Sequence, residues 1–171
     1  MTSVTRPNQS TRGATASDQP WIDRAAAAWS DAICLLGRIL IGGIFVQSGF
    51  QKLMGLDAFA AGLARNGIPG AIAQVLAPIG ATVEFVGGLA IVFGLMTRYA
   101  AVLMILFVIV ATLISHRFWE LSGAAQANQE IHFLKNVAIV GGYLALFVAG
   151  PGLYSVDHWL AHRLSFARRW R

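Results

Sequence analysis

Apolar residues are concentrated in four long stretches that are separated by more polar connections. The stretches cover residues 32–50, 71–95, 99–115 and 131–149. Each is close to the ~20 residues that an α-helix needs to cross the hydrocarbon core of a bilayer. No stretch alternates between apolar and polar residues as a half-buried strand does. The pattern predicts an all-α integral membrane protein with four transmembrane helices.

The composition leads to the same class of protein. Charged residues make up 12% of the 171 residues, about half of the ~25% found in soluble domains. The four apolar stretches contain only three of them, Arg38, Glu84 and Lys135. A soluble globular enzyme is therefore excluded as the leading interpretation. The single cysteine, Cys34, allows neither an intramolecular disulfide nor a dithiol redox pair.

The net charge of +5 is unevenly distributed. Most Lys and Arg residues outside the spans fall in the N-terminal segment, the second connection and the C-terminal tail. The positive-inside rule then places both termini in the cytoplasm. Topology thus explains the basic charge, which argues against nucleic-acid binding. The inner residues are Arg6, Arg12, Arg24, Arg98, Arg163, Arg168, Arg169 and Arg171, and the outer ones are Lys52, Arg65 and Arg117.

Both ends of the chain differ from the spans. Residues 1–20 are rich in Ser, Thr, Gln and Asn and have no apolar run, which predicts disorder. Apolar residues recur at helical spacing between 21 and 33, which predicts an interfacial helix that leads into the first span. Residues 155–171 predict a basic amphipathic tail helix on the membrane surface, with Ser155 as its N-cap. The four-helix domain then covers residues 21–154.

Small residues share a helix face with the charged residues of the spans. Spacings of three and four residues bring side chains to one face, and small residues let membrane helices approach closely. A left-handed four-helix bundle with inward polar groups follows. The expected inward faces are Arg38, Gly42, Phe45, Gly49 and Lys52 in the first span; Gly80, Glu84, Gly87, Ile91 and Gly94 in the second; Ala101, Met104, Val108, Ala111 and Ser115 in the third; and Lys135, Ala138, Gly142, Ala145 and Ala149 in the fourth.

The three intramembrane charges are expected to form a polar centre, because lipid-facing charge costs about 2.5–3.5 kcal/mol per residue at mid-bilayer. Their depths in the predicted spans favour Arg38 as the partner of Glu84, with Lys135 as a competing partner. Two interpretations of the centre remain open. It is either a buried ion pair that fixes helix register or a site that holds a proton or a polar headgroup such as a quinone carbonyl. The supporting residues are Lys52, Asn136 and Gln47.

Other cofactor chemistry finds little support in the sequence. Haem in a membrane bundle needs opposed histidines within the spans, but His116 and His132 flank the outer connection, and His158 and His162 lie on the tail. We interpret them as interfacial residues; the alternative is that the outer two converge as metal ligands or as a proton relay. No metal site is assigned.

Several short motifs follow one another in a specific order. The segment from Leu36 to Asp157 that contains them resembles the DoxX family of small bacterial membrane proteins. The motifs are Arg38-Ile-Leu-Ile-Gly42, Phe45 and Ser48-Gly-Phe-Gln-Lys52; Glu84-Phe-Val-Gly-Gly88 and Phe93-Gly-Leu-Met-Thr-Arg98; and Phe133-Leu-Lys-Asn136, Gly141-Gly142, Gly150-Pro-Gly152, Ser155 and Asp157.

The resemblance implies a four-helix protein of the cytoplasmic membrane. The family name comes from subunits associated with quinone-linked oxidation of sulfur compounds, and other members are linked to oxidoreductase assemblies in stress defence. We therefore expect a membrane subunit or anchor of an oxidoreductase system, with partner subunits in the bilayer and quinone as the one cofactor suggested. A homo-oligomer is compatible with this role. The alternative is a non-catalytic membrane scaffold or a small-molecule permeation protein.

Overall fold

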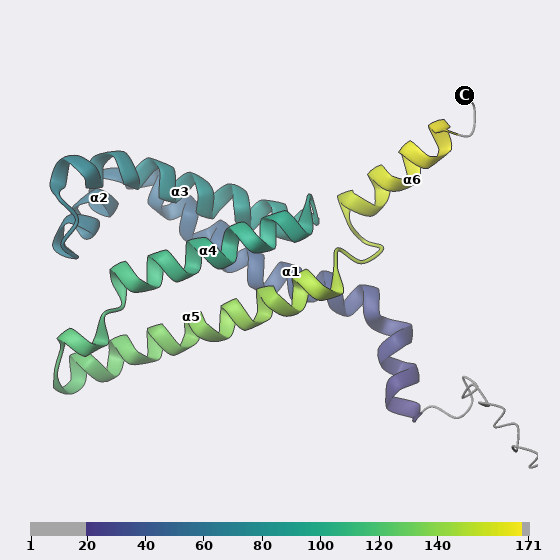
Figure 1. The fold of residues 1–171 in the computed structure, drawn as a ribbon, viewed down its shortest axis with the longest axis horizontal. Coiled ribbons are helices and arrows are strands. Elements are labelled where there is room, and N and C mark those ends of the chain that lie inside the picture. Colours follow the sequence, from purple (N-terminus) through teal and green to yellow (C-terminus); the bar gives the residue numbers. More distant parts are fainter. Residues whose placement is uncertain (1–19, 169–171) are drawn as a thin grey trace, which may run out of the picture. The chain divides into compact units, whose positions relative to one another are not determined.

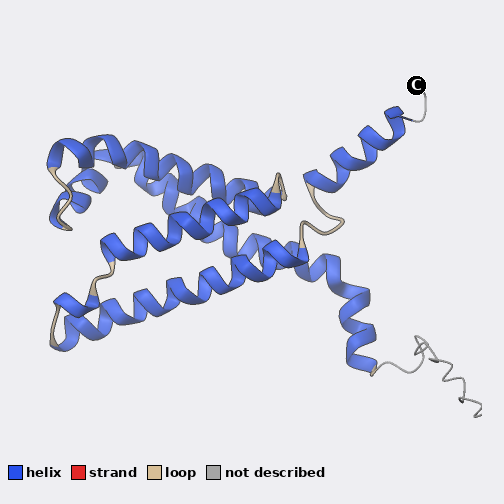
Figure 2. Cartoon of the chain, in the orientation of Figure 1, coloured by secondary structure: helices blue, strands red, loops and turns tan. Residues whose placement is uncertain are grey.

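The computed structural model describes residues 20–168, and this part of the chain folds into helices with no strand (Figures 1 and 2). The expected disorder of residues 1–19 and the tail end at 169–171 lie outside the described residues. The elements are α1 (Trp21–Met54), α2 (Leu56–Arg65), α3 (Gly70–Phe93), α4 (Thr97–Ser115), the 3₁₀ turn η2 (Phe118–Glu120), α5 (Gly123–Ala149) and α6 (Val156–Arg168).

Four of these helices are long and apolar enough to cross a membrane. They are α1, α3, α4 and α5, so the prediction of four transmembrane helices is confirmed. α5 begins at Gly123, earlier than the predicted span, because helix replaces much of the expected third connection. The left-handed twist of the bundle and the interfacial position of its flanking helices stay predictions.

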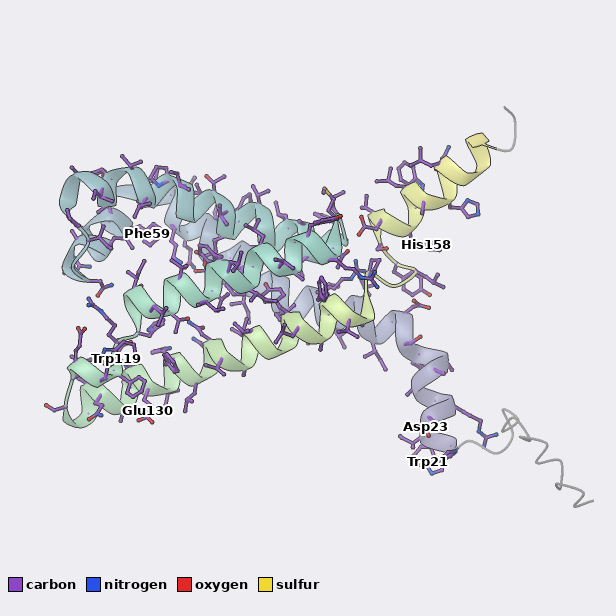
Figure 3. The ribbon with its side chains drawn as sticks, viewed as in Figure 1. Trp21, Asp23, Phe59, Trp119, Glu130 and His158 are labelled. Carbon is purple, nitrogen blue, oxygen red and sulfur yellow. The ribbon has the colours of Figure 1, made fainter. Side chains whose placement is uncertain are left out.

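The described chain divides into two compact units between Ser30 and Asp31, within helix α1. In the N-terminal unit, the N–H groups of Asp23 and Arg24 donate to the Pro20 carbonyl and start the helix. Trp21 and Trp29 are exposed there, and Figure 3 labels Trp21 and Asp23 near the helix start.

Glycines bring the backbones of α1 and α3 into direct contact. A Cβ added at Gly49 would lie 2.6 Å from the backbone nitrogen of Phe85, and one at Gly42 would lie 2.9 Å from the Gly88 carbonyl oxygen. No larger residue fits without a shift of one helix. The contacts set the register of the two antiparallel helices and place Glu84 inside the bundle.

A different seam joins α4 to α5. Met104, Val108 and Tyr143 are buried there, and Phe45 of α1 packs on the Tyr143 ring with centroids 5.9 Å apart. Large side chains, and not small ones, therefore fill the centre of the bundle next to α5.

The inward faces expected for the first three spans are found buried or half-buried, but the face expected for the fourth is wrong. The buried residues of α5 are Tyr143 and Leu146, because the α4–α5 seam is filled by bulky side chains. The small-residue face points outward instead. Its exposed members are Lys135, Ala138, Gly142, Ala145 and Ala149.

After α5 the chain returns to the beginning of the bundle. The Leu153 N–H donates to Asp31 Oδ1 at 2.7 Å, and the Cys34 thiol approaches the Gly150 carbonyl oxygen at 3.5 Å. Gly150 has φ +81°, a conformation that favours glycine. The Ser155 Oγ then accepts the His158 N–H at 3.1 Å, which confirms Ser155 as the N-terminal cap of α6.

Candidate functional site

The most buried carboxylate of the bundle is paired with a lysine. Glu84 lies within α3 and its side chain is 3% exposed, while Lys52 in the last turn of α1 is 31% exposed. The Lys52 Nζ donates to Glu84 Oε2 at 2.5 Å. The pair compensates a carboxylate that would be costly to bury alone.

The predicted pairing of Arg38 with Glu84 is therefore wrong. The helix register places the Arg38 guanidinium against Gly94, which is ten residues from Glu84 along α3, or about 15 Å. Lys135 is exposed, and its Nζ lies 3.2 Å from the Nδ1 of His132. The ion-pair partner of Glu84 is instead Lys52, which was expected only as a supporting residue. Lys52 lies one helical turn after Gly49, which contacts α3 at Phe85, and its long side chain extends back to Glu84.

The Lys52 side chain also lines an apolar pocket of about 210 Å³. Its walls come from α1 to α4, and Lys52 is the one charged residue among them. Ser115 adds a hydroxyl at the rim. The remaining lining residues are Phe59, Leu63, Leu76, Ile79, Gly80, Val83, Phe107, Val110, Ala111 and Ile114.

Helix α2 covers one side of this pocket. Its buried residues Ala60 and Leu63 pack with Ala73 and Ala77 of α3. This contact places Phe59, labelled in Figure 3, so that its ring lies 5.0 Å from the Lys52 Nζ. Such a cation–π contact helps to hold an ammonium group in apolar surroundings.

Tyr143 is a polar residue of the core that sequence reasoning missed. Its side chain is fully buried, and its hydroxyl has no hydrogen-bond partner among the described residues. The one feature of the sequence that could have indicated this buried polar side chain is the position of Tyr143 in the middle of the fourth span. A buried phenol without a partner is an available donor inside the bundle.

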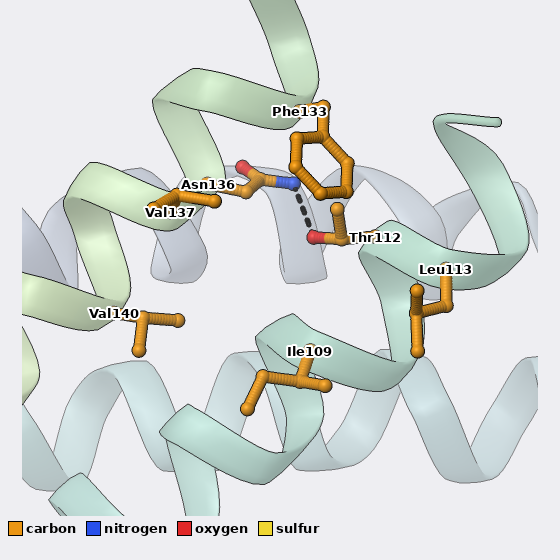
Figure 4. A pocket seen from close by; sticks show the side chains of 7 residues that line it. All are labelled: Ile109, Thr112, Leu113, Phe133, Asn136, Val137 and Val140. Carbon is orange, nitrogen blue, oxygen red and sulfur yellow. Dashed lines mark hydrogen bonds between the residues drawn. The ribbon is translucent and has the colours of Figure 1, made fainter. Parts of the chain in front are cut away.

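A second pocket of about 160 Å³ opens between α4 and α5 (Figure 4). The Asn136 Nδ2 donates to Thr112 Oγ1 at 2.8 Å, and the Thr112 hydroxyl donates to the Val108 carbonyl at 2.6 Å. Asn136 thus belongs to this pocket and not to the Lys52 pocket. Gln47 is exposed and lines neither.

His116 and His132 lie side by side. The rings of His116 and His132 stack with centroids 5.3 Å apart, and the His116 Nδ1 is 2.7 Å from Gln129 Oε1. Within residues 20–168, no three His, Cys, Asp or Glu side chains are grouped as metal ligands. Their interpretation as interfacial residues stays a prediction, with metal binding or proton transfer as the alternative.

Comparison with known proteins points to one family. The sequence profile of the DoxX family matches residues 33–117, from α1 through α4. The chain is 36% identical to the inner membrane protein YphA of Escherichia coli strain K12, over 73% of this chain and 88% of that protein. It is 34% identical to the inner membrane protein YqjF of the same organism, over 76% and 93% of the two chains.

A third relative comes from another organism. The uncharacterized membrane protein Rv3486 of Mycobacterium tuberculosis is 30% identical, over 77% of this chain and 82% of that protein. No solved structure matches the chain. The profile match, these relatives and the four membrane-spanning helices together show that the chain belongs to the DoxX family of integral membrane proteins.

Proposed function

We propose that this protein binds the headgroup of a membrane quinone in the Lys52 pocket and acts as an inner-membrane subunit of an oxidoreductase system. The observation that carries the proposal is an apolar pocket with one charged residue on its wall, Lys52, whose ammonium group is paired with the buried Glu84. The naming of two relatives as inner membrane proteins supports the location.

The residues present fit a quinone headgroup. A quinone carbonyl accepts hydrogen bonds, and Lys52 is a donor on the pocket wall. The apolar walls suit the ring and the isoprenoid chain. When bound, a quinone supplies chemistry that takes up two electrons and two protons. Lys52, which Glu84 holds in place, would orient the carbonyl, while a partner subunit supplies the electrons.

Direct binding tests the proposal. Purified protein in detergent is titrated with decylubiquinone, and binding is measured by equilibrium dialysis. Gly80→Leu fills the pocket, and a Cβ at Gly80 meets only the Phe59 ring at 3.7 Å, so the fold should tolerate it. Gly141→Leu is the matched control, because nothing lies within 4 Å of a Cβ there.

We expect saturable binding that Gly80→Leu abolishes and Gly141→Leu preserves. Lys52→Met should also weaken binding, since it removes the donor from the pocket wall. Equal partitioning of the quinone into both leucine variants would overturn the proposal. The scaffold or permeation interpretation would then explain the protein better.

A further inference from the structure

One side of α5 is left uncovered by the rest of the described chain. The buried residues of this helix, Tyr143 and Leu146, face α4, and exposed residues recur on the opposite side at alternating spacings of three and four. This is the heptad spacing with which a helix packs against a second helix in a left-handed coiled coil. The α5 stripe, as we call these residues, consists of Ala124, Ala127, Ile131, Leu134, Ala138, Gly141, Ala145 and Val148, all of which are exposed.

The residues of the α5 stripe suit close contact with another helix. Ala138, Gly141 and Ala145 follow one another along it, and nothing lies within 4 Å of a Cβ added at Gly141. Small residues of this kind let the backbones of two membrane helices approach each other. Ile131 is 64% exposed and Leu134 is 57% exposed, so the stripe also presents large side chains. Lipid covers apolar residues as well as a helix does, so the charged residues beside the stripe decide what packs on it.

Two exposed residues of opposite charge border the α5 stripe. Glu130, labelled in Figure 3, directly precedes Ile131 on one edge, and Lys135 directly follows Leu134 on the other. Neither belongs to an ion pair within the described residues, and the His132 ring near the Lys135 Nζ brings no negative charge. Glu130 and Lys135 lie about 140° apart around the helix, too far to pair with each other. Lys135 also lies inside the predicted fourth span, where a charge that faces lipid is costly. Both charges therefore call for a partner outside this helix.

A second copy of this chain carries the matching charges. Copies inserted in the same orientation present parallel α5 helices to each other around a twofold axis along the membrane normal. In such a parallel pair, each edge of one helix faces the opposite edge of the other, and side chains that are five positions apart in the sequence meet across the contact. Glu130 of one copy therefore meets Lys135 of the other, and the symmetry repeats this pair on the second edge. The α5 stripe and its two charges thus complement themselves.

We propose that the protein forms a homodimer through the α5 stripe, with two Glu130–Lys135 ion pairs between the copies. The apolar residues of the stripe form the contact, and each Lys135 exchanges lipid for a carboxylate. This contact is separate from the Lys52 pocket, whose walls come from α1 to α4, so it stands whether or not quinone binds there.

Charge reversal tests the pairing in the purified full chain. Sedimentation equilibrium in density-matched detergent measures the dissociation constant of the dimer. Glu130→Lys alone and Lys135→Glu alone each place like charges at both edges of the contact, and each should raise this constant about tenfold, as the loss of two surface ion pairs would. The double reversal restores both pairs and should return the constant to that of the unchanged protein. Asp57→Lys is the matched control, because it reverses an exposed charge on α2, and it should have no effect.

Cysteine cross-linking in membrane vesicles locates the contact without detergent. In a Cys34→Ser background, Ala138→Cys should form a disulfide-linked dimer on oxidation, whereas Leu106→Cys, which is exposed on α4, should not. A monomer at every concentration, a dimer that the single reversals leave intact, or a double reversal that fails to restore the dimer would each overturn the proposal. Cross-linking of Ala138→Cys to another protein and not to a second copy would overturn it too, and would assign the α5 stripe to a partner subunit.

Discussion

The carboxylate of Asp157 caps the first turn of α4 through Thr97, although the two residues belong to different helices. Asp157 Oδ2 accepts both the backbone N–H of Thr97 at 2.8 Å and its hydroxyl at 2.9 Å. The Asp157 N–H in turn donates to the Gly94 carbonyl at 3.0 Å. The start of α6 is thereby fixed to the turn between α3 and α4.

Asp157→Asn should lower the free energy of unfolding by about 1 kcal/mol, as the loss of a helix cap usually does. The substitution removes the negative charge at the positive end of α4 and one acceptor oxygen. Thermal unfolding in detergent measures the change. Asp57→Asn is the control, because Asp57 is exposed in the first turn of α2. Equal stability of the two variants would contradict the role of this cap.

A double-mutant cycle on Lys52 and Glu84 should show coupling. Removing one member of a buried pair costs about 3–5 kcal/mol, and we expect the lower end because Lys52 is 31% exposed. Lys52→Ala should be worse than Glu84→Ala, since it leaves the more deeply buried charge alone. The double variant should lose less than the sum of the singles.

The same cycle run on Arg38 and Glu84 provides the comparison. The register of α1 and α3 keeps these residues apart, so their losses in unfolding free energy should add. Coupling between Arg38 and Glu84 that exceeds the coupling of Lys52 with Glu84 would refute the pairing described above.

Gly49→Ala should destabilise the bundle. A Cβ there would lie 2.6 Å from a backbone nitrogen of α3, so the helices must separate, and overpacking of this kind costs about 1–3 kcal/mol. Gly43→Ala, on the same helix with nothing within 4 Å of the new Cβ, should leave the unfolding temperature in detergent unchanged. Equal effects of the two would mean that α1 and α3 are not in close contact.

The distribution of arginines predicts that both termini lie in the cytoplasm. Reporter fusions placed after Arg171 and within residues 123–129 check this prediction. Alkaline phosphatase should be active only in the second fusion, because the connection between α4 and α5 would face the periplasm. Activity at the C-terminus would reverse the topology.

Apolar length was enough to predict the four spans, because a bilayer sets the length of any helix that crosses it. The inward faces of α1, α3 and α4 were also predictable, since their glycines and alanines do lie at helix contacts. The same argument failed for α5. A small residue fits a tight helix contact but can equally face lipid. In α5 the larger side chains of Tyr143 and Leu146 occupy the interior of the bundle, and the small residues do not.

The burial of Glu84 could be predicted from the sequence, but the residue that forms an ion pair with it could not. Span boundaries read from the sequence are uncertain by several residues, and the α1–α3 register depends on where glycine backbones touch. The contact of Gly49 with Phe85 decides that register, and no spacing within a single helix contains this information. The cap that Asp157 provides for α4 could not be predicted either, because it joins residues that are 60 positions apart in the sequence.

The return of the chain from α5 to α1 has a consequence for biosynthesis. Arg38 belongs to α1, which is translated before the other three described spans, yet the carbonyl that accepts its hydrogen bond belongs to Tyr154. The Asp31 carboxylate likewise accepts its hydrogen bond from the N–H of Leu153, which is translated much later. The first span therefore enters the membrane with an unpartnered guanidinium, and its neighbours are completed only after the fourth span has been translated. A nascent chain stopped before residue 150 should engage the quality-control proteases of the membrane, whereas one that extends past residue 157 should escape them.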